Sequence, residues 1–170
     1  MGGEKKKILV FGGDGLVGSE MVRTLSSSHA ITCPPHQEVD VTDKKHVRSC
    51  IKTVRPDYVI YAAGFSRVDE AEQNPDKTFS LNFEAPQFIA EQVADVPIPV
   101  CYFSTDAVFD GMQSQKPYGE DDATNPVSVY GKASFGAKRQ FYLPLLTTWG
   151  CESLWHMPLY MPEERIPHGS

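Results

Sequence analysis

Short apolar runs alternate with longer amphipathic stretches from about residue 7 to residue 132 of this chain. The short runs predict four strands, over residues 8–11, 30–33, 58–62 and 99–104. Apolar positions that recur every three or four residues predict helices between them, over residues 16–25, 47–54 and 79–93. Strands that alternate with helices are typical of βαβ units, so the pattern predicts an α/β fold with a parallel sheet.

Prolines and one capping position refine these elements. Pro34 and Pro35 supply no backbone N–H to a sheet and therefore end the second strand. Pro86 lies inside the last helical stretch, where it predicts a break or a kink. Thr42 or Asp43 is expected to cap the second helix, because either side chain can accept a hydrogen bond from the first turn.

The composition argues against several classes of protein. The chain has 170 residues, of which 41% are hydrophobic, and this favours one globular domain. A formal net charge of -6 argues against nucleic-acid binding, and no apolar run approaches the roughly 20 residues that a membrane span needs. The first residues do not form a secretory signal. Because the cysteines are widely spaced and the histidines lie at no ligand spacing, we expect reduced thiols, no metal site and a cytoplasmic location.

A glycine-rich segment follows the first predicted strand and opens the first predicted helix: Gly12-Gly13-Asp14-Gly15-Leu16-Val17-Gly18. Gly12 permits a tight turn, Gly15 lets backbone amides approach a pyrophosphate, and Gly18 lets the helix pack closely on the strand. The N-terminus of the helix adds partial positive charge. The segment therefore predicts a dinucleotide-binding loop on a Rossmann-type, doubly wound parallel sheet; a purely structural turn is the alternative.

Further motifs follow in order along the chain: Ala62-Ala63-Gly64, Val68-Asp69-x-Ala71-Glu72, Asn82, Ser104-Thr105-Asp106-x-Val108-Phe109-Asp110-Gly111, Glu120 and Pro126-x-x-x-Tyr130-Gly131-Lys132. Together with the glycines they resemble the extended short-chain dehydrogenase/reductases. Within that family the chain is similar to the dTDP-4-dehydrorhamnose reductase group, which includes the regulatory beta subunit of methionine adenosyltransferase. The resemblance covers about residues 7–132, and the block around Thr105 is far more specific than the glycines.

The resemblance implies three catalytic residues, Thr105, Asp106 and Tyr130. Tyr130 would give a proton to the substrate carbonyl oxygen as hydride arrives from the nicotinamide, and it would also contact the cofactor. Thr105 would hydrogen-bond the same oxygen. A lone tyrosine is more often a half-buried aromatic residue, but the flanking motif favours the catalytic role.

The resemblance also implies contacts to the cofactor outside the glycine loop. Ala62, Ala63 and Gly64 are small enough for the cofactor to lie across the end of the third strand, and the pair Asp40-Val41 would flank the adenine. The choice between NADP and NAD stays open. The second strand ends in Cys33-Pro34-Pro35, which offers neither an acidic ligand for the ribose nor an arginine.

The chain departs from the family pattern after Tyr130. The family has Tyr-x-x-x-Lys, whose lysine binds the nicotinamide ribose and lowers the pKa of the tyrosine, whereas this chain has Ser134. Lys132 is no substitute, because two residues along a helix turn a side chain by about 200°. From Phe135 onward prolines interrupt the candidate elements. We therefore expect an NAD(P)-binding Rossmann domain over residues 1–132, truncated before the substrate-binding lobe, and an atypical tail over residues 133–170.

This departure from the family pattern leaves two hypotheses for the origin of the tail and three for the function of the chain. A shifted reading frame from Ala133 would explain the tail; a diverged native ending is the alternative. The first function is NAD(P)-dependent reduction of a 4-keto sugar nucleotide, with this chain weak or inactive because the lysine and the lobe are missing. The second is a non-catalytic regulatory subunit that binds NADP and the catalytic subunit of methionine adenosyltransferase, and the third is a truncated, inactive isoform.

Overall fold

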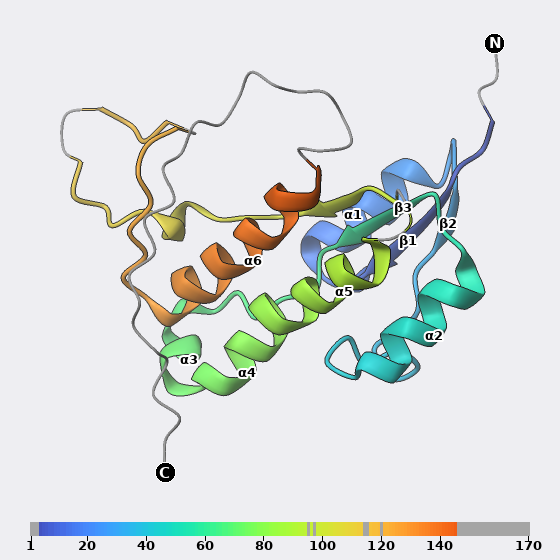
Figure 1. Ribbon diagram of the computed structural model, residues 1–170, viewed down its shortest axis with the longest axis horizontal. Coiled ribbons are helices and arrows are strands. Elements are labelled where there is room, and N and C mark those ends of the chain that lie inside the picture. The colour runs from blue at the N-terminus through green and yellow to red at the C-terminus, as the bar shows by residue number, and fades with distance from the viewer. Residues whose placement is uncertain (1–3, 95, 97, 114–115, 120, 146–170) are drawn as a thin grey trace.

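Figure 1 shows the computed structural model of the chain, which describes residues 4–94, 96, 98–113, 116–119 and 121–145. Its centre is a parallel sheet with the strand order β2-β1-β3-β4. The strands are β1 (Lys7–Phe11), β2 (Ala30–Thr32), β3 (Tyr58–Tyr61) and β4 (Val100–Tyr102). They lie within a residue or two of the predicted apolar runs, which confirms the parallel α/β sheet. Glu120 and residues 146–170 lie outside the described residues.

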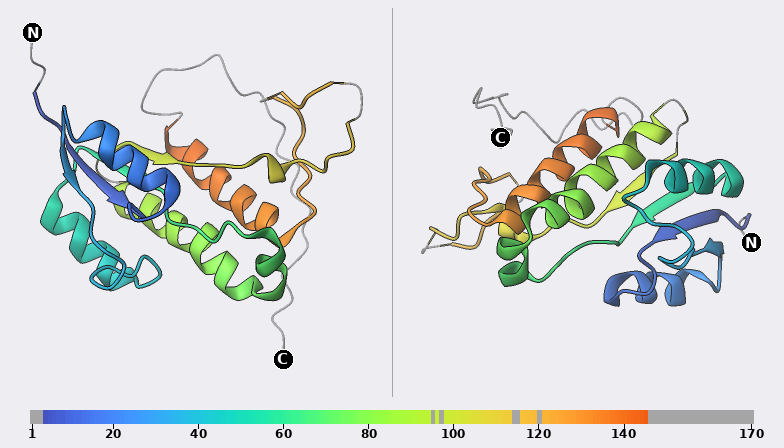
Figure 2. Two further views of the ribbon diagram at one scale, coloured as in Figure 1. Left: turned by 180° about the vertical axis from the view of Figure 1, so that it is seen from behind. Right: turned by 90° about the horizontal axis from the view of Figure 1, so that it is seen from below.

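Helices cover both faces of this sheet (Figure 2). Successive side chains of a strand point to opposite faces, so each strand contributes to two apolar clusters. On one face α1 (Leu16–Leu25) packs against Ile8, Val10 and Ile60. On the other face α2 (Lys44–Val54) and α5 (Ala85–Val93) pack against Leu9, Phe11, Val59 and Tyr61. The doubly wound arrangement is therefore confirmed.

The remaining helices lie on the side of the sheet where β4 is the last strand. They are α3 (Val68–Gln73), α4 (Pro75–Phe79), the π-helix η1 (Ser80–Glu84), the 3-10 helix η2 (Asp106–Val108) and α6 (Val129–Leu145). Helix α6 lies beside the continuous rod of α4, η1 and α5 (Figure 1). It crosses the predicted boundary between residues 132 and 133 and buries Ala133, Ser134 and Ala137. The chain thus stays helical beyond the point where the atypical tail was predicted to begin.

The order of the strands reverses between β1 and β3. From β1 the chain runs through α1 to β2 on one side, and α2 then returns it to β3 on the other side of β1. Ligands of open α/β sheets bind outside the carboxyl ends of the strands at such a reversal. The glycine-rich segment leaves β1 at this position.

The helix does not break at Pro86, so the break is the wrong alternative of the predicted break or kink. Pro86 lies in the first turn of α5, and the helical rod continues through it from η1. The irregularity precedes the proline, because the N–H of Ala85 reaches back to the carbonyl of Ser80, and Pro86 has no N–H to donate to Asn82. Two carbonyls are thereby released, and tyrosine hydroxyls of the sheet satisfy them. Tyr61 donates to Leu81 O at 2.6 Å and Tyr102 to Asn82 O at 3.4 Å.

Asp43 is the residue that caps α2. Its carboxylate accepts hydrogen bonds from the N–H groups of Lys45, at 2.7 Å, and His46, at 3.3 Å. These bonds hold the pKa of Asp43 below its usual value. Thr42, the other predicted cap, instead donates its N–H and its hydroxyl to Asp40.

None of the helices in the described ranges is long and apolar enough to cross a membrane. Among the same residues there is no group of three or more histidine, cysteine, aspartate or glutamate side chains placed to hold a metal ion. Cys33, Cys50 and Cys101 are free thiols.

Candidate functional site

The glycine loop joins two segments that lie far apart in the sequence. Gly12 has a φ of 80°, which L side chains rarely adopt, and a Cβ there would lie 2.4 Å from the backbone nitrogen of Ala63. A Cβ at Gly18 would lie 2.1 Å from the carbonyl oxygen of Gly12. Both positions therefore require glycine for packing, and the turn after β1 contacts the predicted Ala62-Ala63-Gly64 segment after β3 directly.

Gly15 differs from these two glycines. A Cβ at this position would make only an ordinary contact, 3.4 Å from Gly12 O, and the residue is exposed. Gly15 is also the N-cap of α1, in an extended conformation that any residue adopts, and no side chain caps the helix there. The packing of the described chain does not explain a glycine here. An open helix N-terminus with no side chain in front of it matches the approach of a phosphate group.

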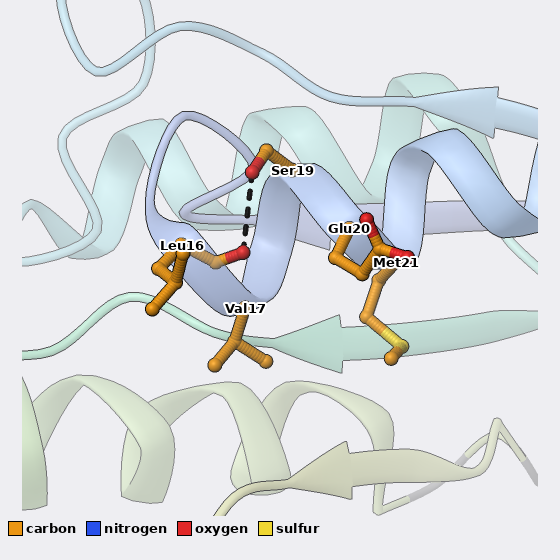
Figure 3. A pocket seen from close by; sticks show the side chains of 5 residues that line it. All are labelled: Leu16, Val17, Ser19, Glu20 and Met21. Carbon is orange, nitrogen blue, oxygen red and sulfur yellow. Dashed lines mark hydrogen bonds between the residues drawn. The ribbon is translucent and has the colours of Figure 1, made fainter.

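The residues after Gly15 stand out from the core. Leu16 is 91% exposed and Val17 is 44% exposed, although both begin an otherwise amphipathic helix. Together with Ser19, Glu20 and Met21 they line a shallow pocket, toward which Leu16, Val17 and Met21 point from one side of α1 (Figure 3). Asp14 is exposed as well. Asp14, Leu16 and Val17 therefore lie at the helix N-terminus without being part of the core.

Asn82 fixes the segment after β3. Its side-chain Oδ1 accepts the N–H of Phe65 at 2.7 Å, and its Nδ2 donates to Phe65 O at 2.9 Å. Asn82 is only 5% exposed and comes from η1, 17 residues away in sequence. Sequence reasoning included Asn82 among the motifs but gave it no role. The available signal was an asparagine inside an apolar helical stretch, since a buried amide needs hydrogen-bond partners.

Asp40 and Val41 face different environments. Asp40 Oδ1 accepts the N–H of Thr42 at 2.9 Å and its hydroxyl at 2.7 Å, and these bonds lower the pKa of Asp40. Val41 is 7% exposed and belongs to the core beneath α2 and α5. Val41 therefore anchors this segment, and Asp40 is the half-buried member of the pair.

The predicted catalytic residues lie after β4 and at the start of α6. Thr105 Oγ1 accepts the N–H of Ala107 at 3.2 Å and donates to Asp106 Oδ1 at 3.0 Å. A Cβ at Gly131 would lie 2.2 Å from Ala107 O, so the first turn of α6 touches the turn that Thr105 caps. Tyr130, the second residue of α6, is half-buried. The fold thus brings Thr105 and Asp106 to the turn of α6 that carries Tyr130.

Ser134 occupies the inward position one helical turn after Tyr130. It is 3% exposed, and its hydroxyl hydrogen-bonds the hydroxyl of Tyr102. Burial raises the pKa of Tyr102 to about 12, and the neighbouring Tyr130 raises it too, while the bond to Ser134 acts in the opposite direction. Lys132, two residues after Tyr130, is exposed. The place of the family lysine is therefore filled by a neutral hydroxyl pair.

One carboxylate organises the loop between η2 and α6. Asp110 accepts hydrogen bonds from the Tyr118 hydroxyl at 2.5 Å, from Met112 N at 3.0 Å and from Asn125 Nδ2 at 3.0 Å. The Tyr118 bond is the largest of the influences that lower the pKa of Asp110 to about 2. The rings of Phe109 and Tyr118 stack with centroids 4.4 Å apart. Asp110 thus ties both ends of this loop together.

The candidate segments share one edge of the sheet. The glycine loop follows β1, the Ala62–Gly64 segment follows β3 and Thr105 follows β4, and these three strands are parallel neighbours. Their carboxyl ends therefore lie side by side. This arrangement can hold an extended ligand from the N-terminus of α1 toward Thr105 and Tyr130.

Comparisons with known proteins agree with this geometry. A family model described as the RmlD substrate binding domain matches residues 6–138. The dTDP-4-dehydrorhamnose reductase of Sinorhizobium fredii is 39% identical over 94 residues, which are 55% of this chain and 31% of that protein. The methionine adenosyltransferase 2 subunit beta of Bos taurus is 29% identical over 142 residues, which are 79% of this chain and 42% of that protein.

Solved structures share the fold. The dTDP-4-dehydrorhamnose reductase of Bacillus anthracis, solved in complex with NADP, matches with a TM-score of 0.78 and 23% identity. The match covers 84% of this chain and 51% of that chain. This chain thus spans about half or less of the length of the relatives described here. Because the family model covers most of the sequence, from the strand β1 into the helix α6, the chain belongs to the RmlD substrate binding domain family.

Proposed function

We propose that this chain binds a nicotinamide dinucleotide, NADP or NAD, along the carboxyl edge of β1, β3 and β4. Gly15 is the observation that carries the proposal, because the fold needs glycine at Gly12 and Gly18 but leaves the space before Gly15 open. The pyrophosphate would lie at the N-terminus of α1, where backbone N–H groups and the helix dipole favour an anion. A relative of the same fold was solved with NADP, which supports this class of cofactor.

The other predicted residues take their places around this cofactor. Asp14, Leu16 and Val17 would border the pyrophosphate, and Asp40 and Val41 would lie toward the adenine. Ala62, Ala63 and Gly64 would let the cofactor cross the end of β3, and the nicotinamide would then lie toward Thr105, Asp106 and Tyr130. When bound, the cofactor would supply hydride; Tyr130 would give the proton and Thr105 would orient the carbonyl oxygen.

The activity is proposed from relatives of which this chain covers about half or less. They include dTDP-4-dehydrorhamnose reductases, so the substrate class is a 4-keto sugar nucleotide. This chain would be a weak or inactive member, because Ser134 provides no cation beside Tyr130. We also propose that residues 1–132 form the NAD(P)-binding domain and residues 133–170 an atypical tail. The proposed location is the cytoplasm.

A regulatory role is the second candidate. The relative from Bos taurus is a beta subunit of methionine adenosyltransferase, and a subunit that binds NADP without turnover does not need the lysine. The neutral hydroxyl pair of Ser134 and Tyr102 favours this alternative. In that case the partner would be a methionine adenosyltransferase catalytic subunit.

The cofactor proposal is tested with Gly15→Val. A branched side chain would fill the space that the pyrophosphate needs, so the affinity for NADPH, measured by titration calorimetry, should fall more than tenfold, about 1.4 kcal/mol. Ser27→Val is a matched control, since Ser27 is exposed beyond the far end of α1 and should leave the affinity unchanged. Unchanged affinity in folded Gly15→Val would remove the cofactor assignment.

A second experiment separates the two candidate roles. NADPH oxidation with a dTDP-4-keto sugar is measured beside a pull-down with methionine adenosyltransferase. Turnover without capture supports the reductase, and capture without turnover supports the regulatory subunit.

A further inference from the structure

Glu72 makes a contact that the proposed function does not yet use. Its carboxylate Oε1, at the C-terminal end of α3, accepts the backbone N–H of Val129 at 2.7 Å. Val129 is the first residue of α6 and lies 57 positions further along the chain. In the sequence Glu72 belongs to the motif Val68-Asp69-x-Ala71-Glu72 and has no assigned role, whereas the fold connects it to the helix that carries Tyr130.

This bond completes the N-terminus of α6. The first turn of a helix leaves four backbone N–H groups without intrahelical partners. Ser128 is the partner of one of them, because its Oγ accepts a hydrogen bond from the N–H of Gly131 at 3.0 Å. The carboxylate of Glu72 accepts the hydrogen bond from the N–H of Val129, and its negative charge lies at the positive end of the helix dipole. A side chain from a separate helix therefore caps the position that Ser128 does not reach.

The opposite side of the same turn is fixed by packing. Gly131 lies so close to Ala107 O that a Cβ would come within 2.2 Å of it. The backbone is thus held at Val129 by α3 and at Gly131 by η2. Tyr130 lies between these two positions, so both contacts restrain its backbone.

We propose that Glu72 is a positioning residue, which sets the direction of Tyr130 relative to Thr105 through the first turn of α6. This role rests on the proposed function, in which Tyr130 borders the nicotinamide. Glu70 lies on the same helix but does not share this role, because its carboxylate pairs at 2.6 Å with Arg67, the N-cap residue of α3. Two glutamates two residues apart therefore differ in whether they connect α3 to α6.

The test compares two ligands on the full chain. NADPH carries a nicotinamide, whereas adenosine 2′,5′-bisphosphate reaches only the adenine end of the site. Titration calorimetry with both ligands is carried out on the wild-type chain, Glu72→Ala, Glu72→Asp, Glu72→Gln and the control Glu70→Ala. Circular dichroism verifies that each variant is folded, and hydrogen exchange at the Val129 amide shows whether the bond to residue 72 is lost.

The expected signature is a change in the ratio of the two affinities. Glu72→Ala should weaken NADPH binding about fivefold and leave bisphosphate binding within about twofold. Glu72→Asp should behave alike, since its shorter side chain keeps the charge but falls short of Val129. Glu72→Gln retains an acceptor oxygen and should recover most of the NADPH affinity, and Glu70→Ala should change neither ligand. In a Tyr130→Phe background the effect of Glu72→Asp should shrink, because the positioned hydroxyl is gone.

Three outcomes would overturn the proposal in distinguishable ways. If Glu72→Asp weakens both ligands equally, the bond serves the fold as a whole and not Tyr130. If Glu72→Asp changes neither affinity, the contact has no role in the site. If the wild-type chain binds neither ligand, the proposed cofactor site is itself wrong, and the role of Glu72 falls with it.

Discussion

The two ends of the candidate site depend on different parts of the chain, one on backbone geometry and the other on side chains. At β1 the geometry comes from the backbone, because Gly12 adopts a positive φ and Gly18 allows α1 to lie against the turn. At α6 the proposed chemistry would depend on side chains, namely Thr105, Tyr130 and the residue at position 134. Backbone geometry is preserved as long as the glycines are, whereas a side-chain cation is lost with one substitution. A chain of this kind can therefore keep a cofactor loop while losing the means to transfer a proton.

The sheet itself shows a similar contrast between its centre and its β4 side. Leu9 and Val10 of the central strand β1 are 0% exposed, whereas Cys101 of β4 is exposed and the adjoining Phe103 is 40% exposed. Within the described residues β4 is an edge strand. The glycine-loop end thus rests on a completed core, and the Tyr130 end lies beside a surface that the described part of the chain leaves open.

The largest expected effect is on the rate of turnover. If turnover is not impaired, the contrast between the two ends of the site is wrong. We expect this chain to oxidise NADPH with a dTDP-4-keto sugar at least about 100-fold more slowly than a relative with the lysine, since a positioned acid contributes about 10²- to 10⁴-fold. Ser134→Lys alone should recover little, because the lysine would displace the buried contact to Tyr102. Replacing the chain after Lys132 with a family-like continuation should restore activity. Rapid turnover by the unaltered chain would show that the side-chain half is intact.

A second prediction concerns the backbone half and uses the difference between two glycines. Gly12→Ala combines a strained φ with a contact at 2.4 Å to Ala63 N, so we expect it to lower the free energy of unfolding by about 3 kcal/mol. Gly15→Ala meets only an ordinary contact at an N-cap and should cost less than about 1 kcal/mol. Urea denaturation of both variants measures the difference. Equal losses would mean that Gly15 is retained for folding, which removes the main argument for a phosphate at this position.

The sequence predicts the parts of the molecule that depend on periodicity and on local backbone geometry. The apolar runs locate all four described strands, and Asp43, one of the two predicted caps, caps α2. The contacts that join separate elements were not predictable, among them the clamp of Asn82 on Phe65 and the cap of Glu72 on α6. Such hydrogen bonds depend on how elements meet in space, and apolar spacing carries no information on this. The released carbonyl of Leu81 was missed for the same reason, since its partner Tyr61 belongs to another strand.

The smallest expected effect is a pH dependence in the loop that leads to α6. The pKa of Asp110 is lowered from 3.8 to about 2, first by the Tyr118 hydroxyl and then by Met112 N–H and Asn125. A carboxyl group whose pKa is lower in the folded chain stabilises it above the unfolded pKa, and this contribution is lost as the pH falls through the folded value. The free energy of unfolding should therefore decrease between about pH 4 and about pH 2, and Asp110→Asn should flatten that decrease.

Asp121→Asn, on the same loop and exposed, is the control and should keep the wild-type slope. The effect is modest because solvent screens an accessible carboxylate. Urea titrations at several pH values measure it, and identical slopes for Asp110→Asn and the wild-type chain would show that this carboxylate does not hold the loop. In that case the side-chain half of the site would rest on the packing of Gly131 and the cap of α6 alone.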